Sequence, residues 1–251
     1  YVLNGIYLDV SQPTCHNIVG TDGRHLYASN SFSLPLEESL IIPRTKFLGC
    51  REFYMNDGWN ISVPLQENER KWCRLSNRRW SYVTKLIDGN YPNWRQVKPP
   101  ADAAKTVLTI DPPSLQNVIE SIQRMPSSDT ANHTIALEVT GNNAFLRSQA
   151  AGSDHVVRVS VIGAVAQGED LVIHVNRQFL TKALEFGLNR IELIDALSPL
   201  RFVNEGRQMI VMPIRAGEPP VTVPAPTKPP ESDDDNRTMD EEELADAAKS
   251  E

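Results

Sequence analysis

The sequence predicts an α+β fold made of repeated units, each with one helix backed by several mostly antiparallel strands. Two observations favour this fold class: a strand runs directly into a helix three times, and alternating apolar and polar segments separated by turn residues lie between the helices. The expected strand ends Ile42, Ile110 and His174 lie 68 and then 64 residues apart. This similar spacing indicates internal duplication.

The first unit is a strand at 40–42, followed by Pro43 and a helix expected from Arg44 to about Tyr54. Proline suits the first position of a helix, where its missing N–H leaves no hydrogen bond unmade. The second unit is a strand at 107–110 and then a helix with one apolar face, formed by Leu115, Val118, Ile119 and Ile122.

The third unit is a strand at 171–175, followed by Asn176 as the predicted N-cap of a helix that Gly187 ends. Its apolar face consists of Phe179, Leu180, Ala183 and Leu184. Further strands are expected around 135–139 and 157–161, where apolar and polar residues alternate, with a turn at 141–143.

Composition predicts two folded domains and a tail. A chain of 251 residues with 40% hydrophobic residues is long enough for two ordinary cores. Six of the 18 prolines lie within residues 219–230, and residues 217–251 hold eleven acidic and three basic residues. We therefore expect 217–251 to be a disordered, Pro-rich acidic tail. The remaining residues carry 21 acidic and 22 basic side chains, so the acidic pI does not argue against a nucleic-acid-binding body.

Several classes of function find no support in the motifs. The sequence has no P-loop, no G-x-S-x-G and no H-E-x-x-H pattern, and its five histidines are scattered, so we expect neither an enzyme nor a metal site. Asp22 and Asp195 are interpreted as turn residues. Three cysteines without a C-x-x-C pair suggest no disulfide framework or zinc site. No apolar run approaches the roughly 20 residues that span a bilayer, so we expect a cytoplasmic protein without a membrane partner.

Five segments of the chain resemble the bacterial DNA sliding clamps, the ring-forming β subunits of DNA polymerase III. They occur in that family's order and at compatible spacings. The segments are Leu3-Asn4-Gly5, residues 20–26 with the sequence GTDGRHL, Ile42-Pro43-Arg44, residues 85–92 with the sequence KLIDGNYP, and residues 211–215 with the sequence VMPIR. The combination of TDG, KLIDG-x-Y-P and MP-x-R is specific, and the segments are spread from residue 3 to residue 215, so the resemblance extends over nearly all of residues 1–216.

The resemblance implies a sliding-clamp fold, in which the sheets form the outer wall of a ring and the helices line a hole around duplex DNA. A complete subunit of that family has three domains and forms a head-to-tail homodimer. Residues 1–100 would then be the middle domain, incomplete at its N-terminus, and 101–216 the C-terminal domain. The implied function is that of a non-enzymatic processivity factor without a cofactor, which acts in DNA replication.

The implied partners are double-stranded DNA, the DNA polymerase III catalytic subunit and the clamp loader, with self-association into the ring. DNA would be met by scattered cations that contact phosphates without reading sequence. The expected DNA-facing residues are Tyr1, Arg44, Lys46, Arg51, Arg124, Arg177 and Lys182.

Proteins of this family bind short linear motifs of their partners in a pocket between the middle and C-terminal domains. The family's pocket positions correspond here to Leu3, Thr21, Gly23, Arg24, His25, Leu26, Pro92, Val97, Asn176, Phe179, Leu197, Pro199, Ile210, Met212, Pro213, Ile214 and Arg215. Apolar side chains would supply an adaptable floor, and Arg24 and Arg215 could orient peptide carbonyls or carboxylates.

Three departures from the family pattern concern this pocket. Arg24 precedes His25 where the family usually has His then Arg, which leaves open which of the two faces the pocket. Gln96 stands where an arginine is common, and the chain continues past Arg215 into the acidic tail. An alternative is a clamp paralogue that keeps the pocket as a peptide-binding adaptor but encloses no DNA, which the nearly neutral body would allow.

Overall fold

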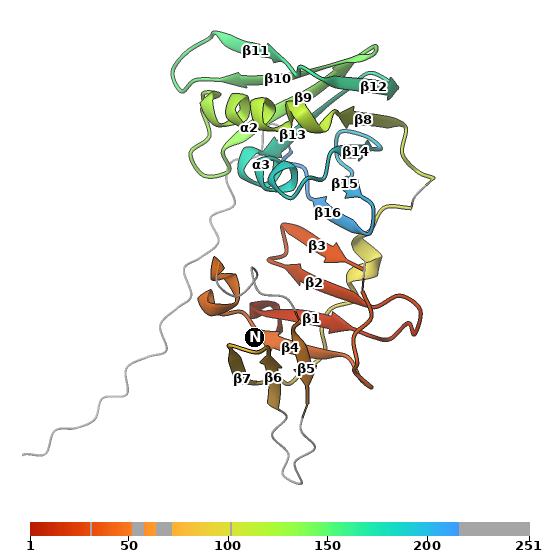
Figure 1. Ribbon diagram of the computed structural model, residues 1–251. Coiled ribbons are helices and arrows are strands. Elements are labelled where there is room, and N and C mark those ends of the chain that lie inside the picture. Colours follow the sequence, from red (N-terminus) through yellow and green to blue (C-terminus); the bar gives the residue numbers. More distant parts are fainter. Residues whose placement is uncertain (31, 52–57, 64–71, 101, 216–251) are drawn as a thin grey trace, which may run out of the picture. The chain divides into compact units, whose positions relative to one another are not determined.

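The computed structural model describes residues 1–30, 32–51, 58–63, 72–100 and 102–215 (Figure 1). The predicted tail at 217–251 lies outside these residues. The described chain is an α+β structure in which neighbouring strands pair in antiparallel fashion throughout the described residues.

The largest sheet has nine strands in the order β12-β8-β14-β15-β16-β3-β2-β1-β4. Its strands are β1 (Gly5–Asp9), β2 (Asn17–Thr21), β3 (His25–Ser29), β4 (Leu40–Pro43), β8 (Thr106–Ile110), β12 (Ala164–Gly168), β14 (Arg190–Leu193), β15 (Leu200–Asn204) and β16 (Arg207–Val211). The two parts of the sequence meet where β16 pairs with β3, with Ile210 opposite Leu26 and Val211 opposite His25. One continuous sheet therefore joins strands from both predicted domains, and the boundary near residue 100 stays a prediction.

The remaining strands of the described residues form two smaller sheets. One has the order β11-β10-β9-β13, and the other β5-β6-β7. Their strands are β5 (Asn60–Ser62), β6 (Trp72–Ser76), β7 (Ser81–Lys85), β9 (Thr134–Thr140), β10 (Asn143–Gln149), β11 (Val156–Ser160) and β13 (Leu171–Asn176).

The second and third predicted helices are confirmed as α2 (Leu115–Arg124) and α3 (Arg177–Glu185). The Asn176 side chain caps α3 by accepting a hydrogen bond of 2.8 Å from the Gln178 amide. Gly187, with φ of +72°, follows the end of the helix. Val118, Ile119 and Ile122 of α2 are buried, as their spacing on one face predicted.

The first predicted helix does not begin at Arg44. Pro43 ends β4 and pairs with Gly5 of β1, and Thr45 is still extended. A 3₁₀ turn, η2 (Lys46–Gly49), follows, Cys50 is extended, and α-helical structure is found only at Arg51, the last described residue before 52–57. Because β4 is an edge strand, Pro43 can end it without leaving a neighbour short of a donor. Residues 52–57 lie outside the described part of the chain.

The main hydrophobic core packs α2 and α3 against the nine-stranded and four-stranded sheets. Its largest fully buried side chains include Phe202, Leu108, Ile122 and Ile173. A smaller cluster around Val19, Leu26, Trp94 and Ile210 lies where β16 meets β3. That second cluster is the base on which the candidate site is built.

Three further 3₁₀ turns are η1 (Val2–Asn4), η3 (Trp94–Val97) and η4 (Pro112–Ser114). Asp22 and Asp195 are turn residues, as predicted: Asp22 accepts from the amides of Arg24 and His25, and Asp195 from those of Leu197 and Ser198.

The part of the chain that the structure describes contains neither a metal-binding cluster nor a membrane-spanning helix. In those residues no group of three or more His, Cys, Asp or Glu side chains could hold a metal ion. None of their helices is both long and apolar enough to cross a membrane.

Candidate peptide-binding site

A cavity of about 170 Å³ lies beside the junction of β16 and β3. Its lining comes from η1, from the end of β2 and the turn into β3, from the segment around η3, and from β16 and the residue after it. The lining residues are Leu3, Thr21, Gly23, Arg24, His25, Leu26, Tyr91, Pro92, Asn93, Trp94, Val97, Ile210 and Met212. Leu26 and Ile210 are buried and belong to the small core cluster, whereas Met212 is 44% exposed. The cavity thus has a fixed apolar base and a movable thioether at its edge.

The turn between β2 and β3 is held by its own side chains. The Asp22 carboxylate accepts hydrogen bonds of 2.9 Å from the amides of Arg24 and His25. The Thr21 hydroxyl donates to the His25 carbonyl at 2.6 Å and accepts from the Gly23 amide. Gly23 has φ of +86°, which favours glycine. These local bonds give Arg24 and His25 fixed backbone positions at the cavity.

Arg24 and His25 both line the cavity, but their side chains differ in surroundings. Arg24 is exposed. The His25 side chain is 15% exposed, with Nδ1 2.8 Å from Asp22 Oδ1 and its ring centroid 4.4 Å from that of Phe179. Burial, aided by the positive charge of Lys182, lowers the pKa of His25 although Asp22 opposes the shift. The imidazole is therefore neutral at pH 7.

The segment after β16 is fastened at two points. The Met212 amide donates to the Arg24 carbonyl at 3.0 Å, and the Ile214 amide donates to the His174 carbonyl at 2.8 Å. These bonds fix the backbone that carries Met212 at the edge of the cavity.

Ten of the predicted pocket residues line this cavity, and seven do not. The seven are Asn176, Phe179, Leu197, Pro199, Pro213, Ile214 and Arg215. Asn176 is occupied as the cap of α3, and Phe179 reaches the cavity only through its contact with His25. Leu197 is 64% exposed, in the turn that Asp195 holds. Their membership of the site stays a prediction.

Sequence reasoning missed three lining residues, Tyr91, Asn93 and Trp94. Tyr91 stacks on Tyr7 with the ring centroids 4.6 Å apart, and Trp94 is 6% exposed. Trp94 adds a large apolar surface that the family pattern did not include.

The predicted DNA-facing residues are mostly accessible. Tyr1 is 89% exposed, and Arg44, Lys46, Arg51 and Lys182 are exposed. Arg124 on α2 pairs with Glu120 at 3.3 Å. Arg177 differs, because its guanidinium donates at 2.6 Å to the Met125 carbonyl at the end of α2. Arg177 therefore has a structural role between the two helices.

Acidification should destabilise the fold partly through His25. Its pKa is lower in the folded than in the unfolded chain, so as the pH falls below about 6.5 the unfolded state takes up the proton first. The stability that His25 contributes is therefore present above that pH and is lost towards its folded-state pKa. Urea unfolding at pH 7.5 and 5.5 should show a smaller pH-dependent loss in His25→Gln than in the parent. The same change at the exposed His155 serves as the control; an equal effect of both variants would contradict the expectation.

Comparison with known proteins gives one consistent result. No protein-family model matches the chain. The chain is 24% identical over 191 residues to the β sliding clamp of Lactococcus lactis, covering 73% of this chain and 48% of that protein. It is 31% identical over 103 residues to the β sliding clamp of Pseudomonas putida, covering 39% of this chain and 27% of that protein. The chain thus spans about half or less of these relatives.

Solved structures of DNA polymerase III β subunits share the fold. That of Pseudomonas aeruginosa superposes with a TM-score of 0.71 at 21% identity and covers 86% of this chain and 59% of its own. That of Thermotoga maritima gives a TM-score of 0.67 at 22% identity and covers 85% and 58%. A further Pseudomonas aeruginosa structure, bound to griselimycin, gives a TM-score of 0.70. The chain is therefore similar in sequence to bacterial β sliding clamps and shares the fold of their solved structures.

Proposed function

We propose that this protein is a DNA sliding clamp, which encircles duplex DNA and tethers the replicative polymerase and other partners by short peptide motifs. The observation that carries the proposal is the apolar cavity at the junction of β3 and β16, because residues between Leu3 and Val97 line it together with Ile210 and Met212. A clamp needs such a receptor, since a ring that slides freely on DNA holds its polymerase through another surface.

The cavity suits a peptide with two or three apolar side chains. Leu3, Leu26 and Ile210 supply an apolar base, and Met212 can adapt to the shape of the ligand. The exposed Arg24 at the same cavity can meet a carbonyl or carboxylate of the peptide. A small, largely preformed pocket of this kind gives affinities in the micromolar range rather than tight binding.

Peptide binding is tested by titrating the chain with a labelled peptide of the type Gln-Leu-x-Leu-Phe. A scrambled peptide is the control ligand. We expect a Kd in the micromolar range for the first peptide only. A Leu26→Ala, Met212→Ala double variant removes apolar surface from the base and the edge of the cavity, so the Kd should rise by about tenfold or more. Val165→Ala, at a 56% exposed position on β12, is the control and should bind as the parent does. An unchanged Kd in the double variant would refute the site.

The DNA arm concerns the full-length protein as a closed ring, a homodimer in the family's arrangement, because the chain spans only about half of its relatives. The support from this chain is the set of exposed cations at Arg44, Lys46, Arg51 and Lys182, which can meet phosphates without reading bases.

Loading the full-length protein onto nicked circular DNA tests this arm. We expect the protein to stay on the circle at a salt concentration that removes nonspecifically bound protein, and to be lost when the circle is cut, because a ring slides off a free end. Equal retention on circular and linear DNA would contradict encirclement. Peptide binding without retention on the circle would favour a peptide-binding adaptor instead.

A further inference from the structure

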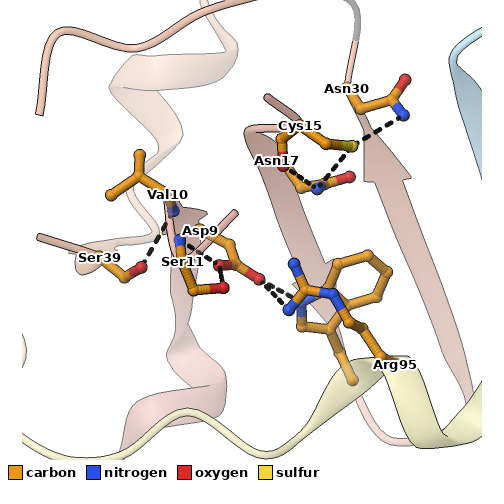
Figure 2. Close-up of polar contacts among 9 residues, drawn as sticks. Asp9, Val10, Ser11, Cys15, Asn17, Asn30, Ser39 and Arg95 are labelled. Atoms are coloured by element: carbon orange, nitrogen blue, oxygen red, sulfur yellow. Dashed lines mark hydrogen bonds and ion pairs between the residues drawn. The ribbon is translucent and has the colours of Figure 1, made fainter. Parts of the chain in front are cut away.

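The Asp9 carboxylate, at the end of β1, is fully buried and accepts from four donors (Figure 2). Its Oδ1 accepts from the Ser11 amide at 3.1 Å and from the Ser11 hydroxyl at 2.7 Å. Its Oδ2 accepts from Trp94 Nε1 at 2.8 Å and lies 2.6 Å from Arg95 Nη1. Oδ1 thus binds only Ser11, two residues away. Oδ2 binds a segment that lies 85 residues further along the chain.

The segment that Asp9 Oδ2 contacts is η3. Few hydrogen bonds within this turn stabilise it. It is a single 3₁₀ turn without a side-chain cap. Two of the backbone hydrogen bonds at its ends, from Gln96 to Asn93 and from Lys98 to Arg95, are long, at 3.2 and 3.3 Å. Short 3₁₀ turns have poor hydrogen-bond geometry and need tertiary contacts to persist. Arg95 also lies over the Trp94 ring, 4.7 Å from its centroid, so the two side chains bound to Asp9 also contact each other.

The same segment forms one wall of the peptide cavity. Tyr91, Pro92, Asn93, Trp94 and Val97 all line it, whereas Asp9, Ser11 and Arg95 do not. The carboxylate therefore contacts this wall through Trp94 and Arg95 without lining the cavity itself.

We propose that Asp9 is a positioning residue for the peptide pocket, which fixes the wall formed by residues 91–97 through Trp94 and Arg95. This inference rests on the proposed peptide-binding function. A carboxylate is suited to the place because it only accepts, and every group around it donates. An asparagine of the same shape would turn its NH₂ group towards one of these donors and would leave the Arg95 guanidinium without its counter-ion.

The experiment compares Asp9→Asn with the parent chain in two measurements. The first is the Kd for the Gln-Leu-x-Leu-Phe peptide, which we expect to rise about tenfold. The second is hydrogen exchange in the free protein, where the amides of Gln96 and Lys98 should exchange at least tenfold faster while those of α2 are unchanged. A purely structural role would lower stability without this selective effect on the pocket wall.

Three further variants separate positioning from a general loss of stability. Ser11→Ala removes a donor from Oδ1 and contacts no part of η3, so its Kd should stay within about twofold of the parent. Ile173→Val lowers stability in the main core, away from the cavity, and should leave the Kd unchanged. Arg95→Gln removes the ion pair at a partly exposed residue that does not line the pocket, so it gives an answer even where Asp9→Asn fails to fold.

The outcomes distinguish the inference from the function on which it rests. If the parent chain does not bind the peptide, the proposed function fails and the inference fails with it. If the parent binds, and both Asp9→Asn and Arg95→Gln keep its Kd and its exchange rates at Gln96 and Lys98, the inference is overturned while the function stands. A higher Kd with faster exchange confined to the segment around η3 supports it.

Discussion

Replacing Phe202 by alanine is expected to lower the free energy of unfolding by about 3–5 kcal/mol. Phe202 lies on β15, is fully buried, and is the largest fully buried side chain among the residues that the structure describes. It pairs across the sheet with Ile191 and Met209, on the face that packs in the main core. Removing the ring leaves a cavity between elements that cannot close over it, because protein interiors are close-packed. Urea or thermal unfolding measures the loss.

The neighbouring Val203 supplies the control for this prediction. It lies on the same strand but on the opposite face of the sheet and is half-buried. Val203→Ala should cost only about 1 kcal/mol, since two partly exposed methyl groups are removed. A similar loss in both variants would mean that the core does not lie on the face where the burial pattern places it. A peptide Kd that is unchanged in folded Phe202→Ala would further show that the cavity depends on β16 and β3 rather than on the packing beneath β15.

Local sequence patterns predicted those elements whose determinants are also local. The α2 and α3 helices followed from apolar residues at helical spacing, and Asn176 and Gly187 marked the ends of α3. The start of the first helix was mispredicted because a proline suits both the start of a helix and the end of an edge strand. The choice between the two is made by pairing of Pro43 with Gly5, 38 residues earlier in the chain, and no local pattern contains that information.

The candidate site also combines features that local sequence determines with features that depend on residues far apart in the chain. The turn at Thr21–His25 could be predicted from TDG, since its hydrogen bonds join residues at most four apart. The pairing of β16 with β3 could not, because it joins residues about 180 positions apart, and only the family resemblance indicated that these segments share a pocket. Trp94 was missed for a related reason: its place in the wall depends on Asp9, whose burial and partners are visible only in three dimensions.

Among the glycines at strand ends, replacement of Gly168 should cause the largest loss in the free energy of unfolding. Gly168 ends β12 with φ of +123°, a conformation that is open to glycine almost alone. A Cβ there would lie 2.0 Å from the Lys105 carbonyl oxygen and 2.8 Å from Thr106 Cα, which are backbone atoms of the paired strand β8 and its approach. Gly168→Ala should therefore cost about 3 kcal/mol or more, because both strain and a backbone displacement are required.

Gly141 is the matched control, since it also has a positive φ, of +56°, but a Cβ there meets nothing within 4 Å. Gly141→Ala should cost only the left-handed penalty of about 1–2 kcal/mol. The difference between the two variants in the free energy of unfolding, measured in urea, separates the steric cost of the close approach of β12 to β8 from the cost of the positive φ angle. Because β12 is the edge strand of the nine-stranded sheet, hydrogen exchange at its amides should also rise in Gly168→Ala while that of β16 and β3 stays as in the parent. Equal losses in the free energy of unfolding would show that the backbone at this sheet edge shifts at little cost. They would also show that β12 contributes little to the stability of the sheet.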